Sequence, residues 1–155
     1  MRIIPIAFAP DANDKAIDAV SSITHAHEIS CEACRIYIHI ARSLLAGKSV
    51  GDAIKENTKD VSETFEPLFS IEQRKLNTIK SSGFVVDTLE SALWCLSTTD
   101  NFRDAVEKAV NLGGDTDTIG AVTGGLAAIA YGFDAIPAEW VGALRKKEMI
   151  DECLF

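Results

Sequence analysis

The stretch GGDTDT at residues 113–118, followed directly by IGAV at residues 119–122, is the most informative part of this chain. Its two glycines allow the backbone to turn sharply and to stay clear of a ligand. Two carboxylates and two hydroxyls follow within four residues, and all are hard oxygen donors of the kind that Mg²⁺ and Ca²⁺ prefer. The apolar residues that come next predict a helix. The pattern therefore indicates a divalent-metal site at the N-terminus of a helix.

A second interpretation of these residues is an ordinary helix N-cap. Asp115, Asp117 or Thr118 could accept hydrogen bonds from the first backbone N–H groups, and the acids would complement the helix dipole. One acid is enough for that purpose, whereas this stretch has two beside two glycines. An EF-hand loop does not fit, because Ile119 and Leu126 stand where that loop needs oxygen ligands. The pattern alone leaves both the cap and the metal site open.

The helix expected from Asp117 to Tyr131 contains three glycines, at positions 120, 124 and 125. Each glycine inside a helix costs roughly 1 kcal/mol relative to alanine, so something must offset that cost. Close approach of neighbouring helices is the gain that we expect. This helix is therefore predicted to lie at the centre of the fold and to hold the carboxylates rigidly.

The rest of the chain predicts an all-α protein with a single domain over residues 1–155. Apolar residues at helical spacing follow candidate N-caps, and we find no alternating strand pattern. Residues 57–82 are the most polar part and predict short helices and a loop, while Asp87 and Glu90 have the spacing of a capping box. The expected helix starts are Asp11 or Asn13, Ser30, Ser49, Asp87, about Phe102, Asp117, and Pro137 for the last helix.

The composition disfavours several classes of function. The chain has 23 acidic and 15 basic residues and a formal net charge of -8, which argues against nucleic acid as a partner because the phosphate backbone is bound through Lys and Arg. No apolar run reaches the ~18 residues of a membrane span. Prolines and acids near the start argue against a signal peptide. We expect a cytoplasmic protein whose four cysteines are reduced thiols.

Four zinc-capable side chains, those of His25, His27, Cys31 and Cys34, lie within ten residues. Their spacing is not that of a standard zinc finger, and no second pair follows. The two cysteines also fit the buried face of a helix. A small zinc protein is an alternative, and we favour His25 as a surface or ligand-contacting residue.

A glycine and an aromatic residue, Gly83 and Phe84, precede Val85 and the helix expected after it. Phe84 could pack as a hydrophobic staple at the start of that helix. It could also form an aromatic wall for a flat ring of a ligand. Local sequence does not separate the two interpretations.

Taken together, these motifs resemble the ADP-ribosylglycohydrolase family, which includes dinitrogenase-reductase-activating glycohydrolases, ADP-ribosyl-acceptor hydrolases and J-type crystallins. The resemblance covers nearly the whole chain. The segment SGFVVDTL at residues 82–89 is similar to the family's SGYVVDTL, with Phe84 where tyrosine is usual. The other matching elements are MRIIPI at 1–6, Thr24-His25, GGDTDTI at 113–119, YG at 131–132 and AIPAEW at 135–140.

The resemblance implies an orthogonal all-helical bundle around two Mg²⁺ ions. Asp115, Asp117 and Thr118 match the family's C-terminal metal ligands. His25 and the three residues Gly83, Phe84 and Val85 match positions that contact ADP-ribose. The implied reaction is Mg²⁺-dependent hydrolysis of the glycosidic bond between ADP-ribose and an acceptor such as a protein side chain, in which the ions polarise ribose hydroxyls and activate a water.

The resemblance further implies that this chain is the C-terminal portion of the family domain. Family members carry an N-terminal half with a catalytic glutamate, a Thr-Asp-Asp metal motif and a phosphate loop, and this chain contains no Thr-Asp-Asp. We therefore expect half of the dinuclear site, weak metal binding, little turnover, and association with itself or with a missing half. The expected partner is an ADP-ribosylated protein or an ADP-ribose-like small molecule. The alternative is a non-catalytic, crystallin-like or nucleotide-ligand-binding fragment.

Overall fold

The computed structural model describes residues 2–153, which are helical and contain no strand. This confirms the all-α prediction. The α-helices are α1 (Asp14–Ser22), α2 (Glu28–Leu45), α3 (Val50–Asn57), α4 (Val85–Ser97), α5 (Phe102–Asn111), α6 (Thr116–Tyr131), α7 (Ala138–Gly142) and α8 (Lys147–Glu152). Short 3₁₀ helices are η1 (Ile4–Phe8), η2 (Glu66–Gln73), η3 (Leu76–Thr78) and η4 (Phe133–Ala135).

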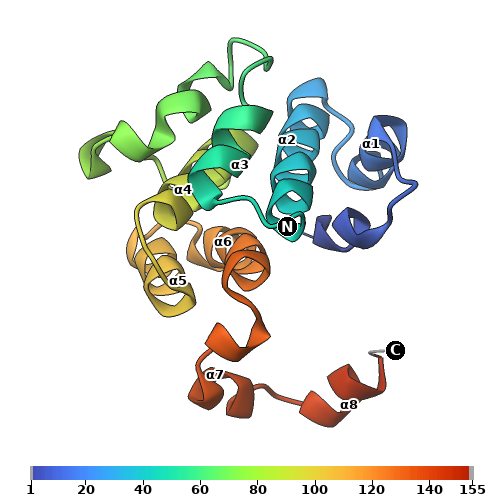
Figure 1. Cartoon of the computed structure of the whole chain (residues 1–155), viewed down its shortest axis with the longest axis vertical. Helices are drawn as coiled ribbons and strands as arrows, with labels where there is room; N and C mark the ends of the chain where they lie inside the picture. Colours follow the sequence, from blue (N-terminus) through green and yellow to red (C-terminus); the bar gives the residue numbers. More distant parts are fainter. Residues whose placement is uncertain (1, 154–155) are drawn as a thin grey trace.

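Helix α6 lies at the centre of the bundle, where it packs against α2, α4 and α5 (Figure 1). Its glycines allow this approach. A Cβ on Gly125 would lie 2.6 Å from the Tyr37 Oη of α2, and one on Gly120 would lie 3.1 Å from a methyl of Val110 on α5. Tyr37 Oη also donates a hydrogen bond to the carbonyl oxygen of Val122 at 3.0 Å. The predicted close helix packing is confirmed.

Two of the predicted N-caps are confirmed and one is wrong. Asn13 accepts a hydrogen bond from the Ala16 N–H at the start of α1, and Ser49 does the same for the Asp52 N–H at the start of α3. Helix α2 begins earlier than predicted. His27, whose backbone is extended, accepts from the Ile29 N–H through Nδ1 at 3.2 Å. Ser30 lies inside the helix and is buried, so it cannot cap it.

The predicted capping box of Asp87 and Glu90 is also wrong. Helix α4 begins at Val85 with Phe84 in the N-cap position, which places Asp87 within the first turn. Glu90 does not reach back to the helix start, because its buried carboxylate forms an ion pair with Arg74. This pair ties the segment before α4 to the helix.

The polar segment of residues 57–82 contains η2, η3 and a loop, as predicted. It is anchored by Phe65, Leu68 and Ile71, each at most 2% exposed. The Trp94 indole N–H of α4 donates to the Arg74 carbonyl oxygen at 2.9 Å. The segment is therefore held against the bundle and leads directly into the loop before α4.

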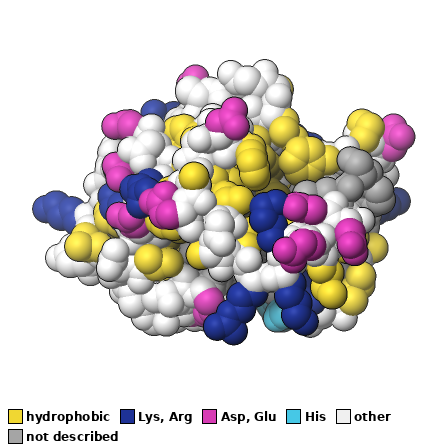
Figure 2. Space-filling view, turned by 90° about the horizontal axis from the view of Figure 1, so that it is seen from below, with side chains coloured by type: hydrophobic (Ala, Val, Ile, Leu, Met, Phe, Trp, Pro, Cys, Tyr) yellow, Lys and Arg dark blue, Asp and Glu magenta, His cyan; other side chains and the backbone are white. Residues whose placement is uncertain are grey.

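The chain after α6 lies to one side of the bundle (Figure 1). Pro137 precedes α7, but this helix ends at Gly142 and α8 follows it, so the predicted single last helix is two short ones. On the face seen from this end, hydrophobic side chains reach the surface between groups of acidic and basic side chains (Figure 2). Within residues 2–153, no helix has both the length and the apolar character needed to cross a membrane.

Candidate metal and ligand site

The acidic turn, residues 113–118, runs from the end of α5 into the first turn of α6. Gly113 and Gly114 have φ values of 78° and 67°, a region that side chains other than glycine rarely enter. Gly114 also lies against the backbone of residue 81. A Cβ on Gly114 would stand 2.1 Å from the Ser81 carbonyl oxygen, and that oxygen accepts a hydrogen bond from the Asp115 N–H at 2.9 Å. The turn is thus fixed against a loop more than thirty residues away in sequence.

Asp115 occupies the N-cap position of α6, yet its side chain makes no capping hydrogen bond. The Thr118 hydroxyl instead donates to Asp115 Oδ1 at 2.9 Å. Asp115 and Thr118 are half-buried, and Asp117 is exposed in the first turn of the helix. The geometry therefore does not support the simple cap interpretation for Asp115.

The donors of the acidic turn fit a hard divalent cation. Asp115, Asp117 and Thr118 supply carboxylate and hydroxyl oxygens within one turn of backbone, which is the donor chemistry that Mg²⁺ takes, with water completing its shell. Neither carboxylate is in an ion pair with the part of the chain that the structure describes. No group of three or more His, Cys, Asp or Glu residues able to hold a metal occurs among residues 2–153. The acidic turn thus offers a cation the carboxylates of Asp115 and Asp117 and the hydroxyl of Thr118.

The loop before α4, residues 80–84, is the site loop that packs against this turn. A Cβ on Gly83 would lie 3.1 Å from Asp115 Oδ2, so Gly83 and the Asp115 carboxylate are direct neighbours. Phe84 is 54% exposed at the start of α4. The structure therefore brings together two of the segments singled out from the sequence.

His25 lies elsewhere, beside an open hollow of about 500 Å³. Its ring is exposed, and Nδ1 is 2.9 Å from the Thr24 hydroxyl oxygen. The hollow shares Ile3 and Cys34 with a second, smaller one of about 60 Å³ that Val85 and Val122 also line. Val122 lies one helical turn after Thr118, so the smaller hollow borders the helix that carries the acidic turn.

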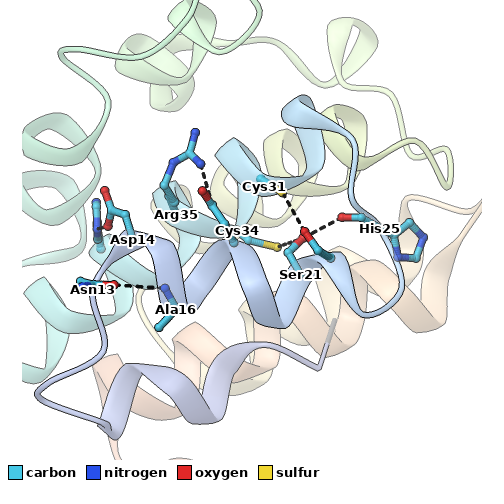
Figure 3. Close-up of polar contacts among 11 residues, drawn as sticks. Asn13, Asp14, Ala16, Ser21, His25, Cys31, Cys34 and Arg35 are labelled. Carbon is cyan, nitrogen blue, oxygen red and sulfur yellow. Dashed lines mark hydrogen bonds and ion pairs between the residues drawn. The ribbon is translucent and has the colours of Figure 1, made fainter.

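The four zinc-capable side chains have separate roles. Cys34 Sγ donates to the Ser21 hydroxyl at 3.5 Å, and Cys31 Sγ lies 3.8 Å from the Ser22 hydroxyl. Both thiols point from α2 toward α1, whereas the His25 ring points away from them (Figure 3). Burial raises the pKa of the Cys34 thiol above its ordinary value. His27 caps α2, and residues 2–153 hold no group of three or more such side chains placed to bind a metal, so the structure does not support the zinc site considered as an alternative.

Sequence reasoning missed the contribution of Ser81 and Ser82 to the site. Ser81 accepts the hydrogen bond that fixes Asp115, and Ser82 organises the site loop from within. The available signal was a Ser-Ser-Gly run before a helix, because serines near a glycine often bond to nearby backbone groups. Nothing in that local pattern indicates which distant turn the loop contacts.

The ADP-ribosylglycohydrolase family model matches residues 1–154, and the chain belongs to the ADP-ribosylglycohydrolase family. An ADP-ribosylarginine hydrolase of Serratia proteamaculans (strain 568) is 36% identical over 135 residues, which are 86% of this chain and 37% of the relative. The ADP-ribosyl-dinitrogen reductase glycohydrolase of Rhodospirillum rubrum is 33% identical over 151 residues, which are 95% of this chain and 50% of the relative.

A solved structure described as an ADP-ribosylglycohydrolase-related protein complex shares the fold. It superposes with a TM-score of 0.83 and 27% sequence identity, over 97% of this chain and 53% of the solved chain. The resemblance and the fold expected from the motifs are confirmed. The chain spans half or less of the length of the two curated relatives. The metal ligands and ligand-contacting residues remain predictions.

Proposed function

We propose that this chain supplies one half of the active site of a Mg²⁺-dependent ADP-ribosylglycohydrolase. The reaction would be hydrolysis of the glycosidic bond between ADP-ribose and an acceptor, with an ADP-ribosylated protein as substrate. The observation that carries the proposal is the acidic turn. Asp115 stands at the start of α6 with a carboxylate that does not cap the helix, is bonded by Thr118 and lies against Gly83.

Asp115, Asp117 and Thr118 are the residues that would hold Mg²⁺. The chemistry that the metal would supply when bound is Lewis-acid polarisation of substrate hydroxyls and of a water near the anomeric carbon. This chain would hold the two carboxylates at the N-terminus of α6, the helix that packs against α2, α4 and α5. His25 and the Gly83–Val85 segment would contact the ADP-ribose portion. No residue of this chain is assigned as the general acid or base.

A non-catalytic protein that binds a nucleotide-like ligand is the second candidate. It is favoured by one observation: residues 2–153 contain no cluster of three acidic or other metal-binding side chains. Two carboxylates make a weak and open Mg²⁺ site, since Mg²⁺ takes about six oxygens. Such a chain would retain the fold and the hollow beside His25.

Metal binding and turnover separate these candidates. We expect Mn²⁺ or Mg²⁺ to bind this chain only at about millimolar concentration, and Asp115→Asn to weaken that binding. Asp134→Asn is the matched control, because Asp134 is an exposed acid in η4, which follows the opposite end of α6. Equal binding by the two variants would show that the acidic turn is not the site.

Turnover is measured as release of ADP-ribose from an ADP-ribosylated protein, with and without Mg²⁺. The isolated chain should be slow, since loss of general acid–base help alone typically costs ~10²–10⁴-fold. Rapid Mg²⁺-dependent release that Asp117→Ala abolishes would show that the chain holds a complete active site. Binding of free ADP-ribose without turnover, weakened by His25→Ala, would favour the ligand-binding protein.

A further inference from the structure

Three hydrogen bonds of Ser82 hold the site loop at the start of α4. The Ser82 hydroxyl donates to Asp87 Oδ2 at 2.5 Å and accepts from the Phe84 N–H at 3.1 Å. The Ser82 carbonyl oxygen accepts from the Thr88 hydroxyl at 3.3 Å. All three bonds involve Ser82, which precedes Gly83, and one of them also involves Phe84, which follows it. Together they fix the path of the backbone on both sides of this glycine.

The other side of the same loop contacts the acidic turn. Ser81 Oγ donates to the Leu112 carbonyl oxygen at 3.3 Å, and the Ser81 carbonyl oxygen accepts from the Asp115 N–H at 2.9 Å. Gly83 stands against Asp115 Oδ2. The loop is therefore the connection between Asp87 on α4 and the Asp115 carboxylate on α6.

We propose that Ser82 and Asp87 are positioning residues for Asp115. Their hydrogen bond holds Gly83 at a fixed distance from the Asp115 carboxylate and so sets the orientation of its oxygens toward a cation. This inference rests on the proposed metal site. Asp87 acts through Ser82 and Gly83, and its Oδ2 is already engaged by the Ser82 hydroxyl.

A positioning role differs in its consequences from a structural one. The Ser82–Asp87 hydrogen bond is exposed to solvent, and surface substitutions of this kind change stability little. Ser82→Ala should therefore leave the urea midpoint of unfolding almost unchanged. Partners that orient a metal ligand typically change metal affinity by 10–100-fold when they are removed.

The chain contains a matched control for this experiment. Ser49 Oγ donates to Asp52 Oδ2 at 2.7 Å at the start of α3, which is the same exposed serine–aspartate contact in another part of the bundle. We expect Ser82→Ala to weaken Mn²⁺ binding about tenfold, measured by paramagnetic broadening of the amide signals of residues 113–118. Ser49→Ala should bind Mn²⁺ as the unmodified chain does.

Charge and position are separated by the choice of variants. Ser82→Ala keeps every carboxylate, whereas Asp87→Ala also removes a negative charge that attracts a cation. Asp87→Asn removes the charge but keeps an oxygen that accepts from Ser82. Positioning predicts that Asp87→Asn retains more affinity than Asp87→Ala. Normal Mn²⁺ binding by Ser82→Ala together with loss in both Asp87 variants would assign the effect to charge and overturn the inference.

Hydrogen exchange of the metal-free chain tests the connection without any metal. Ser82→Ala should speed exchange of the Phe84 and Asp115 N–H groups by about tenfold or more, and Ser49→Ala should not. If the unmodified chain binds no Mn²⁺, the proposed metal site fails, while the exchange rates still report whether Ser82 holds the Asp115 turn. Unchanged exchange of the Asp115 N–H in Ser82→Ala would overturn the inference even where Mn²⁺ binds.

Discussion

The two most specific family stretches in this sequence are residues 113–119, at the start of α6, and residues 135–140, which follow the other end of α6 and lead into α7. They are held in different ways. At the N-terminal end, the acidic turn is fixed by polar backbone contacts to the site loop. At the C-terminal end, the Trp140 ring packs against Phe102 with centroids 6.1 Å apart and stacks under the Arg103 guanidinium. One stretch presents oxygen donors to solvent, whereas the other attaches α7 to the bundle through an aromatic contact. A single signature thus combines a candidate ligand site with a structural anchor.

Among the substitutions that test this comparison, Gly114→Ala should have the largest effect, because it disrupts the contact that holds the acidic turn. An alanine there would have φ near 67° and a Cβ 2.1 Å from the Ser81 carbonyl oxygen, so the turn and the site loop would have to separate. We expect Gly114→Ala to lower the free energy of unfolding by about 3 kcal/mol or more, measured by urea denaturation.

Gly113→Ala is the control for the Gly114 substitution. Gly113 has a similar φ of 78°, but among residues 2–153 a Cβ added to it would meet no atom within 4 Å apart from its own chain neighbours. Gly113→Ala should lower the free energy of unfolding by only roughly 1–2 kcal/mol, which is the cost of a residue other than glycine in the left-handed region. Equal losses in the two variants would mean that the contact with Ser81 does not hold the turn.

The anchor at the other end should be less costly to remove. Trp140 is only half-buried, so Trp140→Ala should cost about 2 kcal/mol, below the usual range for a buried aromatic residue. Leu144→Ala, at a position 51% exposed, should change stability by less than about 0.5 kcal/mol. Urea denaturation measures both.

Mn²⁺ binding at the acidic turn should be unaffected by Trp140→Ala, because Trp140 makes its contacts at the far end of α6. A loss of metal affinity in this variant would show that the two ends of the helix are coupled. The aromatic contact at Trp140 would then not be independent of the candidate ligand site.

The middle of α6 connects the two ends, and Tyr37 tests how firmly it is held. Its hydroxyl is buried, which raises its pKa well above the usual range, and it donates to the Val122 carbonyl oxygen. Tyr37→Phe should cost about 1 kcal/mol, the typical value of one such hydrogen bond. Denaturation by urea and exchange of the α6 amides would measure the effect. A gain in stability would mean that the hydroxyl is crowded against Gly125 rather than well bonded.

Much of this arrangement could be predicted from the sequence, because the informative residues act locally. Glycines at 120 and 125 indicate a closely packed helix, and they contact Val110 and Tyr37 as that requires. Asn13 and Ser49 are recognisable as caps because each precedes apolar residues at helical spacing. The position of α6 at the centre follows from its small residues alone.

The remaining features depend on contacts between distant segments. The sequence distance between Ser81 and Asp115 gives no sign that their backbones are hydrogen-bonded. Glu90 has the spacing of a capping residue, yet Arg74 from the preceding segment pairs with it instead. His27 takes the place of Ser30 as a cap because its backbone is extended, which no propensity shows. Such choices are decided by tertiary structure.

The smallest expected effect concerns the pH dependence of the α7 anchor. A hydrogen bond from Arg103 lowers the pKa of the Glu139 carboxyl below its ordinary value of 4.5. The folded state therefore favours the ionised form, so this contribution to anchoring is present above about pH 4.5 and is lost as the pH falls through the lower pKa of the folded state. Both side chains are exposed, so the effect should be slight and weaker in high salt.

The test is the fluorine NMR signal of 5-fluorotryptophan at position 140, assigned with Trp140→Phe and followed below pH 5. In the unmodified chain it should shift on acidification, whereas in Glu139→Gln it should already have the acid position at neutral pH. A signal that moves identically in both chains would show that Trp140 and Phe102 hold α7 without help from this ion pair.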